Sequence, residues 1–406
     1  MRKRILLPLA LAAAFISPFA SFAQAPASPL TLEQAIALAT SRNPTLSAAR
    51  REHEAADGAV QQAGARPNPT LNASIEDTRR ETRTTTTTLD LPLELGGKRE
   101  ARVTAAERAR DVARAGLANA QAQVRAAAIA AFFQTVVAQE RATLSVASAD
   151  LAGRAAEVVA KRVAAGKVSP VEETRAKVDF ANAQLEAAEA QAELEVARQG
   201  LAAALGEQSL QFGSVVTSGL GAPERPAAGQ LLATIDASPA LVASRMEVER
   251  RRALIEVERT RAKPDVTLSV GAKRDNELGR TQAVIGLSIP LPLLNQNQGA
   301  IYEASKLADK AGDELDATRV RLASEVQQAS SRLTVTRTSL ATLQNTVLPA
   351  AQSAYEAATK GFEAGKFGFI DVLDAQRALL AARSRYLNTL AATYQAATAI
   401  DRIVGQ

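Results

Sequence analysis

Small and apolar residues recur at alternating steps of three and four in two long stretches of the chain. The first stretch covers residues 98–165 and contains no proline. Its repeating positions are Val103, Ala106, Ala113, Leu117, Ala120, Val124, Ala127, Ala131 and Ala138. The second covers about 300–361, with repeating positions Leu315, Leu322, Val326, Ala329, Leu333, Leu340, Leu343 and Val347. This heptad pattern predicts two long helices with narrow packing seams, the first roughly 100 Å long, and Pro349 predicts a kink in the second.

A pair of segments with alternating apolar and polar residues precedes each long stretch. The pairs span about 70–93 and 265–289, and each is interrupted by a short polar tip. The apolar positions include Leu89, Leu91 and Leu93 in the first pair and Ile285, Leu287 and Ile289 in the second. Alternation with a period of two predicts one β-hairpin before each long helix.

The order of elements occurs twice because the chain is an internal duplication. Ala165-Gly166-Lys167 and Ala364-Gly365-Lys366 lie at an offset of 199 residues, and both precede a helix that begins with acidic residues. Repeats of this kind decide how the rest of a sequence is interpreted. We predict a first unit at 24–206, a linker or equatorial segment at 207–229, and a second unit at 230–406.

Each unit also contains two shorter helices, one before the hairpin and one after the Ala-Gly-Lys turn. In the first unit they cover about 31–65, with a break at Asn43-Pro44, and 171–205; in the second they cover about 230–263 and 371–404. Two such helices placed end to end have about the length of one long helix. Each unit is therefore predicted to pair one continuous rod with one rod built from two pieces.

The N-terminus has the pattern of a cleaved secretory leader. A basic start, Met1-Arg2-Lys3-Arg4, is followed by an apolar run and by the small-residue site Ser21-Phe22-Ala23, which predicts a signal peptide over 1–23. Its loss reduces the formal net charge from +5 to +2. No basic block remains, so nucleic acid is not an expected partner. The chain has no Cys, which excludes disulfides and a lipoprotein anchor.

Four strands are too few to close on themselves. A closed β-barrel needs about eight or more strands, and open sheet edges cannot face lipid. If the hairpins lie in an outer membrane, several chains must contribute to one barrel. Three chains would supply a barrel of twelve strands.

The sequence resembles the TolC family of outer-membrane efflux channels over essentially the whole chain after the leader. The resemblance rests on the duplicated order of elements, on Thr31-Leu32-Glu33-Gln34-Ala35-Ile36 followed by Asn43-Pro44, and on the segment from Gly365 to Gln376. Leu93-Glu94-Leu95-Gly96-Gly97-Lys98-Arg99 is similar to the CzcC-type branch, which serves heavy-metal efflux.

The resemblance implies a mainly α-helical chain with a β-barrel part, assembled as a homotrimer. The twelve-stranded barrel would sit among outer-membrane lipids, above an α-helical tunnel that crosses the periplasm. A periplasmic adaptor protein and an inner-membrane pump of the resistance–nodulation–division (RND) type are the implied partners. The implied function is passive export, with heavy-metal cations such as cobalt, zinc and cadmium as substrates and multidrug or other small-molecule efflux as the alternative.

The resemblance also implies site residues. Acidic residues that line the periplasmic entrance in the family match Asp371 and Asp374, which would form rings of carboxylates that attract cations in a trimer. The structural alternative is that they are first-turn acids favoured by the helix dipole. The duplicate position carries Arg175, which could pair with Asp374 as a latch between the halves. Where family members carry a basic residue in the turn before this motif, position 367 is Phe.

The two turns are the predicted docking points for the adaptor, at Gly166 and Lys167 in the first unit and at Gly365 and Lys366 in the second. Their structural alternative is a turn in which Gly supplies a positive φ.

No catalytic or cofactor motif is present, so we expect neither an enzyme nor a cofactor. His53 is the only His, and without Cys no metal-ligand cluster of the usual kind can be drawn. The competing hypotheses are a secreted structural coiled-coil protein, which the hairpins disfavour, and a periplasmic adaptor, which would carry one helical hairpin and more β-structure.

Overall fold

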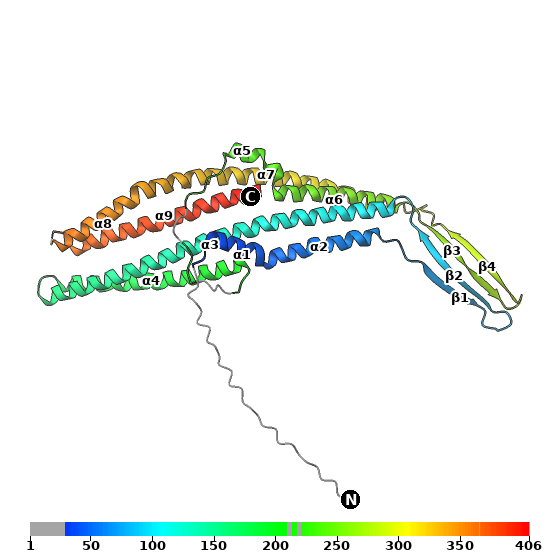
Figure 1. The fold of residues 1–406 in the computed structure, drawn as a ribbon, viewed down its shortest axis with the longest axis horizontal. Helices are drawn as coiled ribbons and strands as arrows, with labels where there is room; N and C mark the ends of the chain where they lie inside the picture. The colour runs from blue at the N-terminus through cyan, green and yellow to red at the C-terminus, as the bar shows by residue number, and fades with distance from the viewer. Residues whose placement is uncertain (1–28, 209–212, 217–220, 365, 406) are drawn as a thin grey trace, which may run out of the picture.

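Helices run along the length of the molecule, and a small sheet bends away from them at one end (Figure 1). The computed structural model describes residues 29–208, 213–216, 221–364 and 366–405, so the predicted leader and Gly365 lie outside the described residues. The first half contains α1 (Leu32–Arg42), α2 (Pro44–Gly64), β1 (Thr70–Glu76), β2 (Thr84–Leu93), α3 (Lys98–Ala164) and α4 (Pro170–Leu205). No helix within the described ranges is both long enough and apolar enough to cross a membrane.

The second half repeats this order with additional breaks. Its elements are α5 (Ala228–Ala233), the 3₁₀ turn η1 (Ile235–Ala237), α6 (Pro239–Arg261), β3 (Val266–Asp275), β4 (Arg280–Ser288), α7 (Gln298–Thr342), the π-helical turn η2 (Leu343–Val347), α8 (Leu348–Glu363) and α9 (Phe369–Val404). The π turn ends two residues before Pro349. Because proline has no N–H to bond the carbonyl four residues earlier, the helix widens there instead of continuing regularly.

The prediction of one uninterrupted helix over 230–263 was wrong. The chain breaks at Ser238, whose backbone is extended and whose side chain accepts a hydrogen bond from the Leu241 N–H at 3.2 Å. Pro239 then occupies the first helical position, where its fixed φ is tolerated and the residue before it is pushed out of the helical region. A break of the same kind separates α1 from α2, where Asn43 caps the helix that begins at Pro44.

The two short helices of each half meet end to end at a glycine and a proline. Gly206 ends α4 with a φ of +82° and lies against Asn43 and Pro44 at the start of α2. Gly405 ends α9 with a φ of +78° and lies against Pro239 at the start of α6. Each half thus pairs one long rod with one built from two stacked pieces.

The largest buried side chains gather at these two joints, about midway along the molecule. The first cluster includes Leu30, Leu46, Phe132, Phe133, Leu201 and Leu205, and the second includes Leu231, Leu241, Leu322, Val326, Ile400 and Ile403. Tyr394 from the second half stacks on Phe133 of the first, with ring centroids 3.8 Å apart. Elsewhere the contacts between helices are small and rich in alanine, which allows the rods to approach closely.

The predicted seam of the second long helix is confirmed except at its ends: Leu322 through Leu343 are buried, Leu315 is half-buried, and Val347, at the π turn, is 37% exposed. The seam predicted for α3 is wrong in part. Ala127 is exposed, whereas Ile129 and Phe132 are buried. The reason is that α3 packs against α2 and α4 of its own half and also against α6 and α9 of the other. A helix buried on several sides does not follow one stripe.

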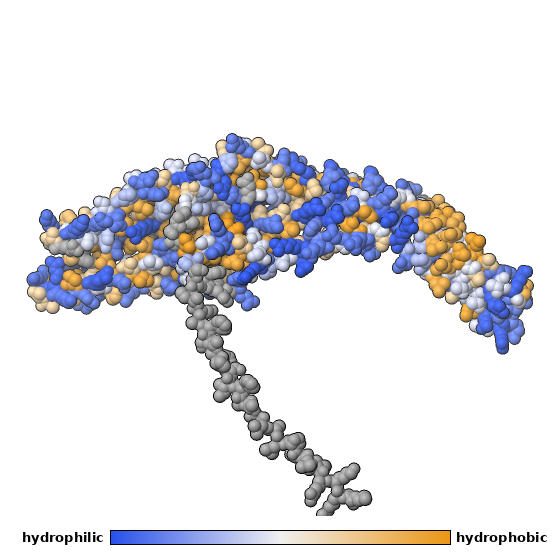
Figure 2. Space-filling view, in the orientation of Figure 1, coloured by the Kyte–Doolittle hydropathy of each residue, from blue (hydrophilic) through white to orange (hydrophobic). Residues whose placement is uncertain are grey.

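The four strands form one antiparallel sheet in the order β1-β2-β3-β4, so the two hairpins join through β2 and β3. Paired positions lie on the same face of the sheet. One face carries the aligned apolar positions Leu71, Leu89, Val270 and Ile285, together with Leu91, Leu268 and Leu287. Figure 2 shows apolar side chains over the part of the sheet next to the helices and hydrophilic ones at its far end.

The opposite face of the sheet is polar and lies on its concave side. Along β4, Gln282, Val284 and Gly286 are half-buried, whereas the alternate positions Ala283 and Ile285 are exposed. No other described element covers either face in Figure 1. The alternating burial along β4 therefore comes from curvature of the sheet, which crowds the side chains on its inner side. The sheet therefore curls with its polar face inward and its apolar face outward.

Candidate channel entrance

The helical ends farthest from the sheet enclose a cleft between the two halves. Its volume is about 630 Å³, and its walls come from the end of α3, the start of α4 and the start of α9. Its lining combines apolar side chains with seven charged ones: Arg162, Glu172, Arg175, Asp179, Asp371, Asp374 and Arg377. The structure thus brings the predicted residues Arg175, Asp371 and Asp374 to one cleft.

Asp371 and Asp374 have different surroundings although both are exposed. Asp371 accepts a hydrogen bond from the Gly368 N–H at 2.8 Å, so it caps its own helix as the structural alternative proposed. Asp374 lies one turn further along α9, and its nearest charge is Arg377, at 3.9 Å. Asp374 is therefore the freer carboxylate of the two.

The ion pair that crosses the cleft is not the predicted one. Arg175 lies 3.7 Å from Glu172 on its own helix, and among the described residues it makes no ion pair with Asp374. Arg377 of α9 instead donates a hydrogen bond to Asp179 of α4 at 3.2 Å. The observed partners are 198 residues apart, against 199 for the predicted pair, so they keep the offset of the duplication almost unchanged and lie one turn further along both helices. The sequence did carry a signal, since both residues lie one turn after the positions considered.

The two turns that end the helical pairs share one backbone hydrogen bond, and the second turn also has an aromatic ring packed on it. Gly166 has a φ of +68°, and the N–H groups of Gly166 and Lys167 close the turn on carbonyls of α3. At the second turn the Lys366 N–H bonds the Gly361 carbonyl at 2.8 Å, and the ring of Phe367 lies directly on Gly361. Lys167 and Lys366 are exposed at the two ends, as docking residues must be.

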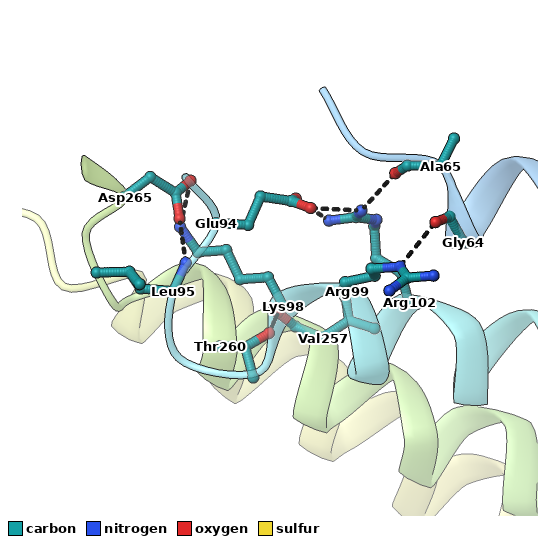
Figure 3. Close-up of polar contacts among 10 residues, drawn as sticks. All are labelled: Gly64, Ala65, Glu94, Leu95, Lys98, Arg99, Arg102, Val257, Thr260 and Asp265. Carbon is teal, nitrogen blue, oxygen red and sulfur yellow. Dashed lines mark hydrogen bonds and ion pairs between the residues drawn. The ribbon is translucent and has the colours of Figure 1, made fainter. Parts of the chain in front are cut away.

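The segment 93–99 forms the joint between the sheet and α3 (Figure 3). Gly96 and Gly97 have φ of +72° and +80°, which lets the chain turn from β2 into the helix. A Cβ on Gly96 would lie 2.3 Å from the Lys263 side chain of the second half. Glycine is therefore required at position 96 for two independent reasons.

Charged side chains of the same segment fix the joint. Lys98 pairs with Asp265 at 2.7 Å, and the other oxygen of Asp265 accepts from the Leu95 N–H at 3.1 Å. Glu94 binds both terminal nitrogens of Arg102, which raises the pKa of that guanidinium above its ordinary value. Asp265 precedes β3, so one carboxylate ties the second hairpin to the start of α3. These contacts hold the bend between the sheet and the rods.

Neither the cleft nor the joint has the character of a tight metal site. Within the described part of the chain, no three His, Asp or Glu side chains are arranged to hold a metal ion. The sequence contains no Cys.

Comparison with known proteins identifies the architecture. The family model described as outer membrane efflux protein matches residues 35–207 and 233–406, one match for each half. The chain belongs to the outer membrane efflux protein family. The predicted resemblance to TolC-type channels is confirmed, and this member is an outer-membrane protein whose helical part extends into the periplasm.

Individual relatives refine this placement of the efflux protein. It is 50% identical to the cobalt-zinc-cadmium resistance protein CzcC of Cupriavidus metallidurans over the full length of both chains. It is 30% identical to the nickel and cobalt resistance protein CnrC of the same organism, over 81% of this chain and 76% of CnrC. The crystal structure of the outer membrane protein VceC from Vibrio cholerae covers 92% of this chain and 96% of VceC, with a TM-score of 0.75 at 20% identity. The 50% identity to CzcC confirms the predicted CzcC-type branch.

Proposed function

We propose that three copies of this efflux protein form a passive export channel for heavy-metal cations, of the cobalt, zinc and cadmium type. The observation that carries the substrate class is the identity of 50% with a cobalt-zinc-cadmium resistance protein along the full length of both chains. The partners would be a periplasmic adaptor and an inner-membrane RND pump, which supplies the energy. The channel itself needs neither an active site nor a cofactor.

The sheet supports the trimer. It has open edges at β1 and β4, and these two strands run in opposite directions. A β4 edge can therefore pair with the β1 edge of a neighbouring copy and continue the antiparallel order. The apolar convex face would then meet lipid, and the polar concave face would line the pore. Three copies would close a barrel of twelve strands and leave no open edge.

The cleft at the opposite end supports a gate. In a trimer, Asp374 and Asp371 would form rings of carboxylates around the entrance, which attract cations and repel anions. The Arg377–Asp179 pair joins the two helical pairs of one chain across the cleft. Both of its side chains are well exposed, so it contributes no more than about 1 kcal/mol. Such a tie is weak enough for a docked adaptor to break.

Hydrated cations would pass without tight binding. Metal transport through a conduit requires attraction that is strong enough for entry and weak enough for exit. Isolated carboxylates on exposed helix turns meet this condition, whereas thiolates and imidazoles would retain cobalt, zinc or cadmium.

The substrate class is tested in a strain that lacks this gene. Deletion is expected to lower tolerance to zinc, cobalt and cadmium, and the intact gene is expected to restore it. Tolerance to dyes, detergents and antibiotics is measured in parallel. A loss of tolerance to these compounds with unchanged metal tolerance would refute the metal assignment and support multidrug efflux. A soluble monomer in the periplasmic fraction, in place of a heat-modifiable trimer in the membrane fraction, would refute the channel.

The gate is tested with R377A and the matched variant R175A in planar bilayers. Arg377 crosses the cleft and Arg175 does not, although the two lie near each other and are similarly exposed. We expect R377A and D179N to raise the open fraction or conductance of the purified channel, and R175A to leave both unchanged. Opening by R175A alone would instead support a latch between Arg175 and an acid of a neighbouring copy.

A further inference from the structure

The concave polar face of the sheet carries few charges, and their placement is fixed by the strand register. Across the middle of the sheet, β2 contributes Asp90 and β3 contributes Lys273. Both belong to central strands, so their neighbours on either side are residues of the same chain. The other charges on this face, Glu76, Asp275 and Arg280, form the row at the far end, next to the hairpin tips.

Asp90 stands near the joint with the helices and has no opposite charge beside it. The register aligns it with Thr70, Ser269 and Gly286, and the next row toward the tips is Asn72, Thr88, Gly271 and Val284. None of these side chains is charged. The carboxylate oxygen Oδ2 accepts a hydrogen bond from Asn72 Nδ2 at 2.6 Å. The other oxygen, Oδ1, is screened from solvent and has no hydrogen-bond partner in the described part of the chain.

The charge of Asp90 is thus held in place but not neutralised. The Asn72 amide fixes the orientation of the carboxylate, and the crowding of the concave face prevents it from swinging away. Its field therefore extends toward the space that the curved sheet encloses. A fixed charge beside a low-dielectric wall concentrates counter-ions in that space.

Lys273 carries the opposite charge further along the same face. It is aligned with Thr86, four residues along β2 from Asp90, which corresponds to about 13 Å. No ion pair is found for Lys273 among the described residues. A cation that leaves the tunnel would therefore meet an attractive ring first and a repulsive ring second.

We propose that Asp90 gives the strand part of the pore its preference for cations and that Lys273 opposes it nearer the outer end. The proposal rests on the trimeric channel proposed above, in which three copies of each residue would form a ring. It assigns selectivity to the β-part of the molecule as well as to the entrance at Asp371 and Asp374. The occupants would be hydrated cations, including divalent metals, held by charge and not by ligation.

The test is the reversal potential of single trimers in planar bilayers under a gradient of KCl, repeated with ZnCl₂. We expect D90N to lower the ratio of cation to anion permeability by about threefold or more. K273Q should shift the same ratio in the opposite direction. D90E keeps the charge and should behave as the unmodified channel. R274Q is the matched control, because Arg274 is the neighbour of Lys273 on the opposite face.

Folding of each variant is checked first by the heat-modifiable mobility of the trimer on gels. If D90N does not assemble, the comparison of K273Q with R274Q still decides whether charges on the concave face set selectivity. Conducting trimers in which D90N and K273Q leave the reversal potential unchanged would overturn the inference while the proposed channel stands. Absence of conductance in the unmodified protein would refute the channel itself.

Discussion

Replacing Gly206 by alanine should separate the two stacked helices of the first half. Gly206 adopts a φ of +82°, which costs an alanine about 1 kcal/mol or slightly more. A Cβ there would also lie 2.7 Å from the Asn43 Cα and 2.6 Å from the Pro44 Cδ. Overpacking against atoms that cannot move adds about 1–3 kcal/mol. We therefore expect G206A to destabilise the fold by about 3 kcal/mol.

The clash cannot be relieved cheaply because it is with backbone. Asn43 is buried, and its side-chain amide donates to the Ala204 carbonyl at 3.0 Å, which fixes it against the end of α4. A shift of Asn43 away from the new methyl group would break this bond and open the joint beside Leu46 and Leu205. Both leucines are fully buried in the central cluster.

The matched control is G166A. Gly166 has a φ of +68°, but a Cβ there would meet no atom within 4 Å. G166A should therefore lose only the free energy that alanine requires to adopt a positive φ, about 1 kcal/mol. The assay is thermal unfolding of purified trimers in detergent, followed by helical circular dichroism. Equal losses of thermal stability in G206A and G166A would refute the stacked joint, because conformation alone would then explain both.

Two further substitutions test other parts of the packing. R225A should destabilise the protein by about 3 kcal/mol in the same unfolding assay. The reason is that the Asp401 carboxylate, which is only 6% exposed, loses the guanidinium that binds both its oxygens at 2.5 Å. A smaller loss of stability in R225A than in the R225A/D401N double variant would contradict this account. G361A should displace the Phe367 ring, since a Cβ would lie 2.0 Å from it, and limited trypsin digestion should then cleave the second turn faster; an unchanged rate would show that Phe367 does not hold that turn.

Much of the fold is local in origin and could be predicted. The hairpins follow from alternation, and the seam of the second long helix follows from its heptads because that helix is buried along one stripe. The break at Ser238-Pro239 could have been predicted as well, since it repeats the break at Asn43-Pro44 at an offset of 195. The α3 seam could not, because burial from both halves obscures the period of a single interface.

The candidate entrance was predicted only in its location. The sequence indicated that acids after the second turn and Arg175 lie near each other, and the cleft contains them. Which cation meets which carboxylate does not follow from the offset of the duplication, because the observed pair keeps that offset to within one residue, 198 against 199. The observed pair lies one turn further along both helices, and there the arginine is on α9 and the carboxylate on α4.

By itself, the sequence determined the duplication, the order of helices and strands, the turns, and a strand face that carries Asp90 opposite its leucines. These properties depend on neighbours in the chain and on periodicity. Only the tertiary structure decided that the two hairpins join into one curved sheet and that its polar face is the inner one. It also decided that the helix ends at Gly206 and Gly405 stack on the prolines that begin α2 and α6. These features depend on contacts between segments more than a hundred residues apart, where small shifts in register or stagger exchange one partner for another.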